Sequence, residues 1–177
     1  MDGADARTGL VTIEEFPYLG SLRSRKKESE LAGSGYLCGA TLIRNRVLVT
    51  TAECAQGKNP MDILGVVGAT YLQGLSTTSK VLEIESIRCH GLYKRGRPSY
   101  NIALAFTAED TLPIKGKLGY VPIAMKRVRP HTRCVGVSWA ANTDVLSNQP
   151  IALPNYSVAS PECYKTIQAV GRLSEAW

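Results

Sequence analysis

The chain has 177 residues, a formal net charge of +6, and a composition that is 44% hydrophobic and 20% charged. These values are typical of one globular domain and exclude a disordered tail. No apolar run reaches the roughly 18 residues that a membrane-spanning helix needs, and residues 1–5 lack the basic start and apolar stretch of a secretory signal.

Glycine and proline recur without a period, which favours many turns and short strands over long helices. We expect strands in the β-prone runs 16–22, 36–43, 47–51, 63–69, 80–88, 102–107, 120–125, 133–139 and 149–158. Residues 44–46 form a polar connection and predict a hairpin between 38–43 and 47–51. This spacing predicts a sandwich or a barrel, which is an all-β fold.

Two further patterns refine this prediction. Glu83 and Glu85 alternate with apolar residues, as expected for a strand with one face in water. Only residues 161–170 look helical, because Ser160 can act as N-cap and Pro161 can occupy the first helical position.

The positive charge is concentrated in two short runs, 24–28 and 94–98. Such runs can bind nucleic acid or another acidic surface. Here they lie in polar stretches, with no nucleic-acid-binding motif and no stacking aromatic residues. We therefore interpret both as solvated loops and expect no nucleic-acid partner.

The chain contains five cysteines, at Cys38, Cys54, Cys89, Cys134 and Cys163. No C-x-x-C pair is present, so we expect no zinc or other metal site. In an oxidising compartment disulfides are expected, and an odd number leaves at least one cysteine unpaired or joined to another molecule.

Several segments resemble, in the right order, those of one family. Residues 16–22 (FPYLGSL) match an early F-P-Y-x-x-S-L strand, and residues 36–43 (YLCGATLI) match an F-C-G-G-S-L-I strand. Residues 47–54 (VLVTTAEC) resemble V-L-T-A-A-H-C, residues 102–104 continue a D-I-A-L strand, and residues 133–139 follow a C-x-x-x-G-W strand. The chain thus resembles the trypsin-like, chymotrypsin-fold serine proteases.

The resemblance implies an all-β, chymotrypsin-like double β-barrel. We expect a complete N-terminal Greek-key barrel in residues 1–115, an inter-barrel linker in 116–132 and an incomplete second barrel in 133–177. Six apolar residues are expected in the first core: Leu42, Ile43, Val47, Val49, Ile102 and Leu104.

The same resemblance implies a degenerate catalytic site. Glu53 stands where the family has histidine, and Asn101 stands where it has the aspartate that orients this histidine. No G-D-S-G-G-P loop, which carries the family's serine, occurs in the chain. We interpret His90 and His131 as surface or packing residues, and a carboxylate is a far weaker base than imidazole at neutral pH. We expect no catalytic residues, no cofactor and no peptidase activity.

The resemblance also assigns the cysteines. Cys38 and Cys54 match the family disulfide beside the histidine position. The family partners of Cys134 and Cys163 lie in a part of the fold that this sequence does not contain, so we expect both to be unpaired or intermolecular. Cys89 matches no family position and is either a small buried apolar residue or a further intermolecular bridge.

The function expected from this resemblance is that of a catalytically inactive serine protease homologue. It would be secreted and would bind a protein partner, such as a protease, an inhibitor or a cascade component, as a regulator or decoy in a proteolytic cascade. The alternative is a trypsin-like serine endopeptidase seen as a truncated fragment, with its nucleophile in a missing C-terminal segment. A third hypothesis, a basic nucleic-acid or glycan-binding module, depends on net charge alone.

Overall fold

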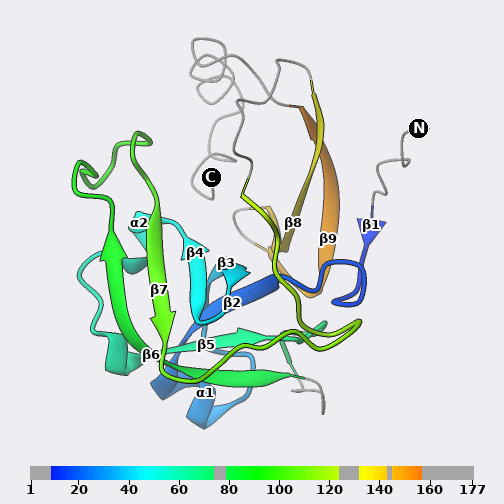
Figure 1. The fold of residues 1–177 in the computed structure, drawn as a ribbon, viewed down its shortest axis with the longest axis horizontal. Coiled ribbons are helices and arrows are strands. Elements are labelled where there is room, and N and C mark those ends of the chain that lie inside the picture. Colours follow the sequence, from blue (N-terminus) through cyan, green and yellow to red (C-terminus); the bar gives the residue numbers. More distant parts are fainter. Residues whose placement is uncertain (1–8, 74–78, 124–131, 143–144, 157–177) are drawn as a thin grey trace.

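The computed structural model describes residues 9–73, 79–123, 132–142 and 145–156. Strands dominate these residues, and the helices are short (Figure 1). The elements are β1 (Gly9–Leu10), β2 (Leu19–Ser24), α1 (Arg25–Glu30), β3 (Tyr36–Arg44), β4 (Val47–Thr50), α2 (Ala52–Ala55), the 3₁₀ helix η1 (Pro60–Asp62), β5 (Ile63–Val67), β6 (Lys80–Cys89), β7 (Ala103–Thr107), β8 (Arg133–Asn142) and β9 (Val145–Tyr156).

Six strands close into a barrel in the order β2-β3-β4-β7-β6-β5, and each pair is antiparallel. After β4 the chain crosses to β5, which pairs with β2 on the other side, and this long connection is that of a Greek key. The prediction of an all-β fold with a closed N-terminal barrel is confirmed.

A second sheet contains three described strands in the order β1-β9-β8. β1, at the start of the described chain, pairs with the late strand β9 through Gly9 opposite Ala152 and Leu10 opposite Ile151. Among the described residues this sheet does not close into a barrel, in agreement with the predicted incomplete second half (Figure 1).

Trp139 joins the second sheet to the first barrel. Its side chain is 1% exposed and packs with Ile13, Leu19 and Leu72. The indole Nε1 donates a hydrogen bond of 2.9 Å to the carbonyl of Thr70. A buried tryptophan needs such a partner for its N–H, so this contact sets the position of β8 against the barrel.

The alternation of strand side chains corrects part of the predicted core. Leu42 and Val47 are buried, as expected, but Ile43, Val49 and Leu104 are half-buried and Ile102 is 46% exposed. Successive strand residues point to opposite faces, so adjacent apolar residues cannot all face the interior. The barrel interior is filled by Leu22, Ala40, Leu42, Leu48, Ile63, Val67, Leu82, Ile84, Ala105 and Leu118.

In β6, by contrast, the predicted alternation is confirmed: Leu82 and Ile84 are buried, and Glu83 and Glu85 are exposed. Two other predictions were wrong. Residues 120–123, the described part of a predicted strand, are not a strand, and the polar run 24–28 is largely the helix α1 rather than a solvated loop. The predicted helix over 161–170 lies outside the described residues.

α1 is held by a buried ion pair that the sequence did not indicate. Arg23 on β2 is fully buried, and its Nη1 lies 3.3 Å from Oε2 of Glu28, which is 8% exposed. Glu28 also accepts hydrogen bonds from the backbone N–H groups of Gly33 (2.9 Å) and Gly35 (3.1 Å). One carboxylate therefore neutralises the buried guanidinium and closes the turn between α1 and β3.

A second ion pair, between Arg25 and Glu83, is exposed. Arg25 donates from both terminal nitrogens to the carboxylate, at 2.9 Å for Nη1 to Oε1. This hydrogen bond is the main cause that holds the pKa of Glu83 below its usual value. The two side chains are 40% and 50% exposed, so solvent screening limits the contribution of the pair to about 1 kcal/mol or less.

The lowered pKa predicts a small acid-side loss of stability. Because the folded-state pKa lies below the unfolded one, the contribution is complete above about pH 4.3 and is lost as pH falls through the folded value. We expect Glu83→Gln to flatten the fall in free energy of unfolding in this acid range, as measured by urea denaturation. Glu30→Gln, on the exposed helix α1, is the matched control, and an unchanged acid slope in Glu83→Gln would contradict the prediction.

Candidate functional site

Strand register brings together Glu53 and Asn101, the two residues predicted to stand at the family's catalytic positions. Thr50, at the end of β4, pairs with Ala103, at the start of β7. Glu53 follows this pair by three residues on β4's side, and Asn101 precedes it by two on β7's side. Because the strands are antiparallel, the chain leaving β4 and the chain entering β7 lie at the same end of the barrel, where α2 carries Glu53 (Figure 1).

Glu53 and Asn101 exchange two hydrogen bonds. The backbone N–H of Glu53 donates to Oδ1 of Asn101 at 2.9 Å, and Nδ2 of Asn101 donates to Oε2 of Glu53 at 3.4 Å. The Asn101 amide thus orients the Glu53 side chain and backbone together. Glu53 itself is exposed.

The side chains of Glu53 and Asn101 match each other electrostatically. A carboxylate can only accept hydrogen bonds, whereas an amide can donate as well. An aspartate at position 101 would bring a second carboxylate within hydrogen-bond reach of Glu53, and two like charges at that distance repel. With asparagine, one side chain accepts from the Glu53 backbone and donates to the Glu53 carboxylate.

A small apolar cluster supports this pair. Buried Ala52, Ala55, Tyr93 and Ala103 pack together, with Ile87 and Cys89 against them. Desolvation raises the pKa of Tyr93, and the nearby Glu53 carboxylate adds to the rise. Sequence reasoning did not single out Tyr93, because it lies in a loop without a periodic hydrophobic pattern.

A disulfide fastens α2 to the barrel. Cys38 on β3 and Cys54 on α2 are bonded, with 6.2 Å between their Cα atoms and a sequence separation of 16. At the start of the helix the Thr51 side chain caps α2 by accepting a hydrogen bond of 3.3 Å from the Cys54 N–H. Cap and disulfide together hold the segment that carries Glu53.

Removing this disulfide is expected to destabilise the protein. Closing a loop of about this length restricts the unfolded chain and stabilises the fold by roughly 3 kcal/mol. We expect Cys38→Ala with Cys54→Ala to lower the free energy of unfolding by about that amount in urea denaturation. Cys134→Ala, which removes an exposed free thiol, is the control. Equal stability of the double variant and the oxidised wild type would contradict the prediction.

Of the remaining cysteines and histidines, the structure describes Cys89, Cys134 and His90. Cys89 is a half-buried free thiol whose pKa is raised by burial, and Cys134 is exposed and free. His90 is exposed and stacks on Tyr100, with 4.9 Å between the ring centroids. His131 and Cys163 lie outside the described residues.

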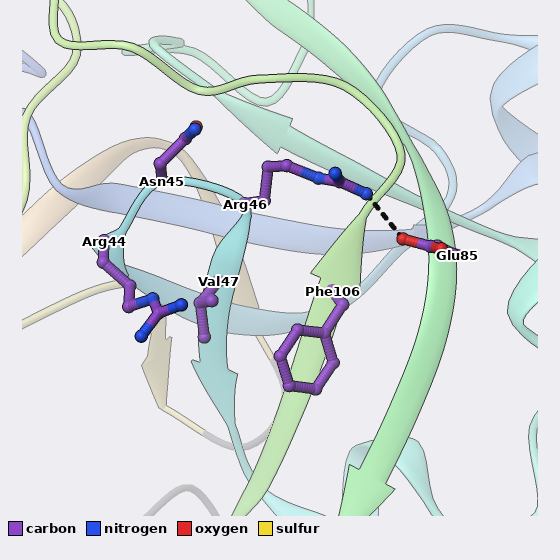
Figure 2. A pocket seen from close by; sticks show the side chains of 6 residues that line it. All are labelled: Arg44, Asn45, Arg46, Val47, Glu85 and Phe106. Atoms are coloured by element: carbon purple, nitrogen blue, oxygen red, sulfur yellow. Dashed lines mark hydrogen bonds and ion pairs between the residues drawn. The ribbon is translucent and has the colours of Figure 1, made fainter.

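A shallow cavity of about 390 Å³ lies elsewhere on the barrel. It is lined by Arg44, Asn45, Arg46, Val47, Glu85 and Phe106. Figure 2 shows the Arg46 side chain reaching from the β3–β4 turn to Glu85 on β6, where Nη2 donates to Oε2 at 2.6 Å. Val47 begins β4 and α2 follows its end, so this cavity is at the opposite end of β4 from Glu53.

Within the part of the chain that the structure describes, no three His, Cys, Asp or Glu side chains converge as a metal site would require. The helices in that part are all too short or too polar to cross a bilayer.

Comparison with known proteins identifies the family. The trypsin family profile matches residues 9–170, and the chain therefore belongs to the trypsin family of serine proteases. Human heparin binding protein has a similar structure, with a TM-score of 0.74 at 20% identity, covering 88% of this chain and 67% of that one. At this identity the likeness establishes the chymotrypsin-like fold.

Curated relatives match at low identity. Human atrial natriuretic peptide-converting enzyme is 28% identical over 112 residues, which cover 60% of this chain and 10% of that protein. Mouse neutrophil elastase is 23% identical over 124 residues, which cover 70% of this chain and 44% of that protein. The matched region thus covers about a tenth of the length of the atrial natriuretic peptide-converting enzyme and less than half of the length of neutrophil elastase.

Proposed function

We propose that the protein is a catalytically inactive member of the trypsin family that acts by binding another protein. The observation that supports this most directly is the hydrogen-bonded pair of Glu53 and Asn101, the residues predicted to stand at the positions of the family's histidine and aspartate. The family reaction needs a group that takes the serine proton and returns it to the leaving group near neutral pH. A solvent-exposed carboxylate is poorly suited to this role.

The structure around Glu53 and Asn101 supports a protein that keeps the family's scaffold without its catalytic chemistry. α2, its cap, the Cys38–Cys54 disulfide and the apolar cluster around Tyr93 are all in place. A scaffold of this kind still presents loops that can contact a protease, an inhibitor or another cascade component. We infer that it works as a regulator or decoy in a proteolytic cascade, in an oxidising compartment such as the extracellular space, where a disulfide persists.

The test is hydrolysis of fluorogenic peptide substrates by the purified protein, for which we expect no turnover. The alternative is an endopeptidase whose nucleophile lies outside the present sequence. This alternative predicts that a longer protein, which includes the nucleophile, cleaves such substrates and that the cleavage depends on Glu53. Turnover by the longer protein that is lost in Glu53→Gln would therefore overturn the proposed function.

A further inference from the structure

The loop between β6 and β7, residues 90–102, carries positive charge and no acidic side chain. No aspartate or glutamate occurs between Glu85 and Glu109. Lys94, Arg95 and Arg97 in this loop are exposed, and no hydrogen bond or ion pair engages their side chains among the described residues. In Figure 1 the loop stands beside α2, at the end of the barrel away from α1.

The same loop exposes large apolar side chains. Leu92 is 61% exposed, Tyr100 is 53% exposed and Ile102 is 46% exposed. Isolated exposed apolar residues are ordinary, but here three of them share one short loop with three free cations. Tyrosine and arginine are also the residue types that contribute most to the centres of protein interfaces.

The loop is held in shape before any partner binds. Tyr93 anchors it in the cluster with Ala52 and Ala103, and its N–H donates to the His90 carbonyl at 3.0 Å. A turn from Lys94 to Arg97 is closed by a 3.0 Å backbone hydrogen bond, with Gly96 at φ +78°. A loop that is already ordered loses less conformational entropy on binding.

We propose that residues 90–102, the docking loop, bind a protein partner through a segment of that partner in which acidic and apolar side chains are mixed. The proposal rests on the proposed function, since it names the surface and the partner chemistry for a protein that acts by binding. Carboxylates of the partner pair with Lys94, Arg95 and Arg97, and its apolar side chains cover Leu92 and Tyr100. A sulfated glycan or a nucleic acid backbone would satisfy the cations but would leave the aliphatic side chains in water.

The experiment measures binding of a fluorescent peptide that alternates glutamate with leucine and phenylalanine, using fluorescence anisotropy at low ionic strength. We expect binding that weakens as salt is added, and that is about tenfold weaker for the peptide with glutamine in place of glutamate. Lys94→Glu with Arg95→Glu and Arg97→Glu is expected to weaken binding by at least about tenfold. Lys26→Glu with Lys115→Glu and Lys117→Glu makes the same change of charge on other exposed lysines and is expected to have less than about a twofold effect.

A second variant separates the apolar contribution. Leu92→Ser with Tyr100→Asn keeps the charge, and asparagine tolerates the positive φ of 62° at position 100. We expect it to weaken peptide binding by about tenfold as well. Near-UV circular dichroism and an intact Cys38–Cys54 disulfide verify that each variant is folded.

The docking loop would be overturned by no binding of the peptide to the wild type, by equal losses in the two charge-reversal variants, or by no loss in Leu92→Ser with Tyr100→Asn. A sulfated oligosaccharide that binds as tightly as the peptide through the same three cations would also overturn it, in favour of a glycan ligand. Mass spectrometry of the recovered peptide distinguishes a failure of the proposed inactive function from a failure of the docking loop. Cleavage of the peptide contradicts the inactive function, whereas an intact but unbound peptide contradicts only the docking loop.

Discussion

The variant Glu53→His with Asn101→Asp is expected to remain without peptidase activity in this chain. It introduces a histidine and an aspartate at the positions where the family resemblance predicts them, and strand register already brings these two positions together. The chain contains no G-D-S-G-G-P segment, so the restored histidine has no serine in its expected loop to activate. Removing a catalytic serine from an intact triad lowers the rate by roughly 10⁶-fold, and restoring its two partners does not recover that loss.

The measurement is turnover of fluorogenic peptide esters and amides by wild type and double variant, beside an active trypsin-family enzyme. Labelling by a fluorophosphonate probe, which reacts with activated serines, is the second readout. We expect neither turnover nor labelling in either form. Turnover that survives purification and increases in the double variant would show that a nucleophile is present in these 177 residues.

The variant Glu28→Ala is expected to lose about 3–5 kcal/mol of free energy of unfolding, because it leaves a buried guanidinium without its partner. Arg23 is fully buried, and burial lowers the pKa of its guanidinium while Glu28 raises it. The substitution also leaves the N–H groups of Gly33 and Gly35 without their acceptor. Alanine has the higher helix propensity, so the loss cannot come from α1 as an isolated helix.

Urea denaturation at neutral pH measures this effect. Glu28→Gln retains a hydrogen-bond acceptor but not the charge, so we expect it to lie between wild type and Glu28→Ala. Glu30→Ala, in the same helix but exposed, is the control and is expected to change stability by less than about 0.5 kcal/mol. A loss in Glu28→Ala no larger than that of Glu30→Ala would mean that the buried pair does not hold this part of the fold.

Glu53 and Asn101, which are predicted to stand at the family's histidine and aspartate positions, suit each other chemically. Each substitution alone would oppose the retained partner: glutamate beside aspartate places two carboxylates together, and asparagine beside histidine changes the acceptor that orients the imidazole. Together they form a satisfied hydrogen-bonded pair. The pair is thus a structural contact between α2 and the segment that leads into β7.

Local patterns in the sequence determined the strands and the family. Alternation of Glu83 and Glu85 with apolar residues predicted β6 and its solvent-exposed face. The cysteine and hairpin segments predicted the closed first barrel. The same segments predicted that Glu53 and Asn101 stand at the family's catalytic positions. The sequence alone predicts these features because the periodicity of apolar side chains, the residues that favour turns and the family motifs each extend over only a few neighbouring residues.

Contacts between distant segments were decided only by the tertiary structure. Nothing around Arg23 indicates that it is buried, because its partner Glu28 belongs to a run that by itself is typical of a solvated loop. β1 pairs with a strand about 140 residues later in the chain, and Ile102 is exposed although it precedes a buried strand residue. Such outcomes depend on which charges and apolar faces meet when the barrel closes, and on the high cost of burying a charge without a partner.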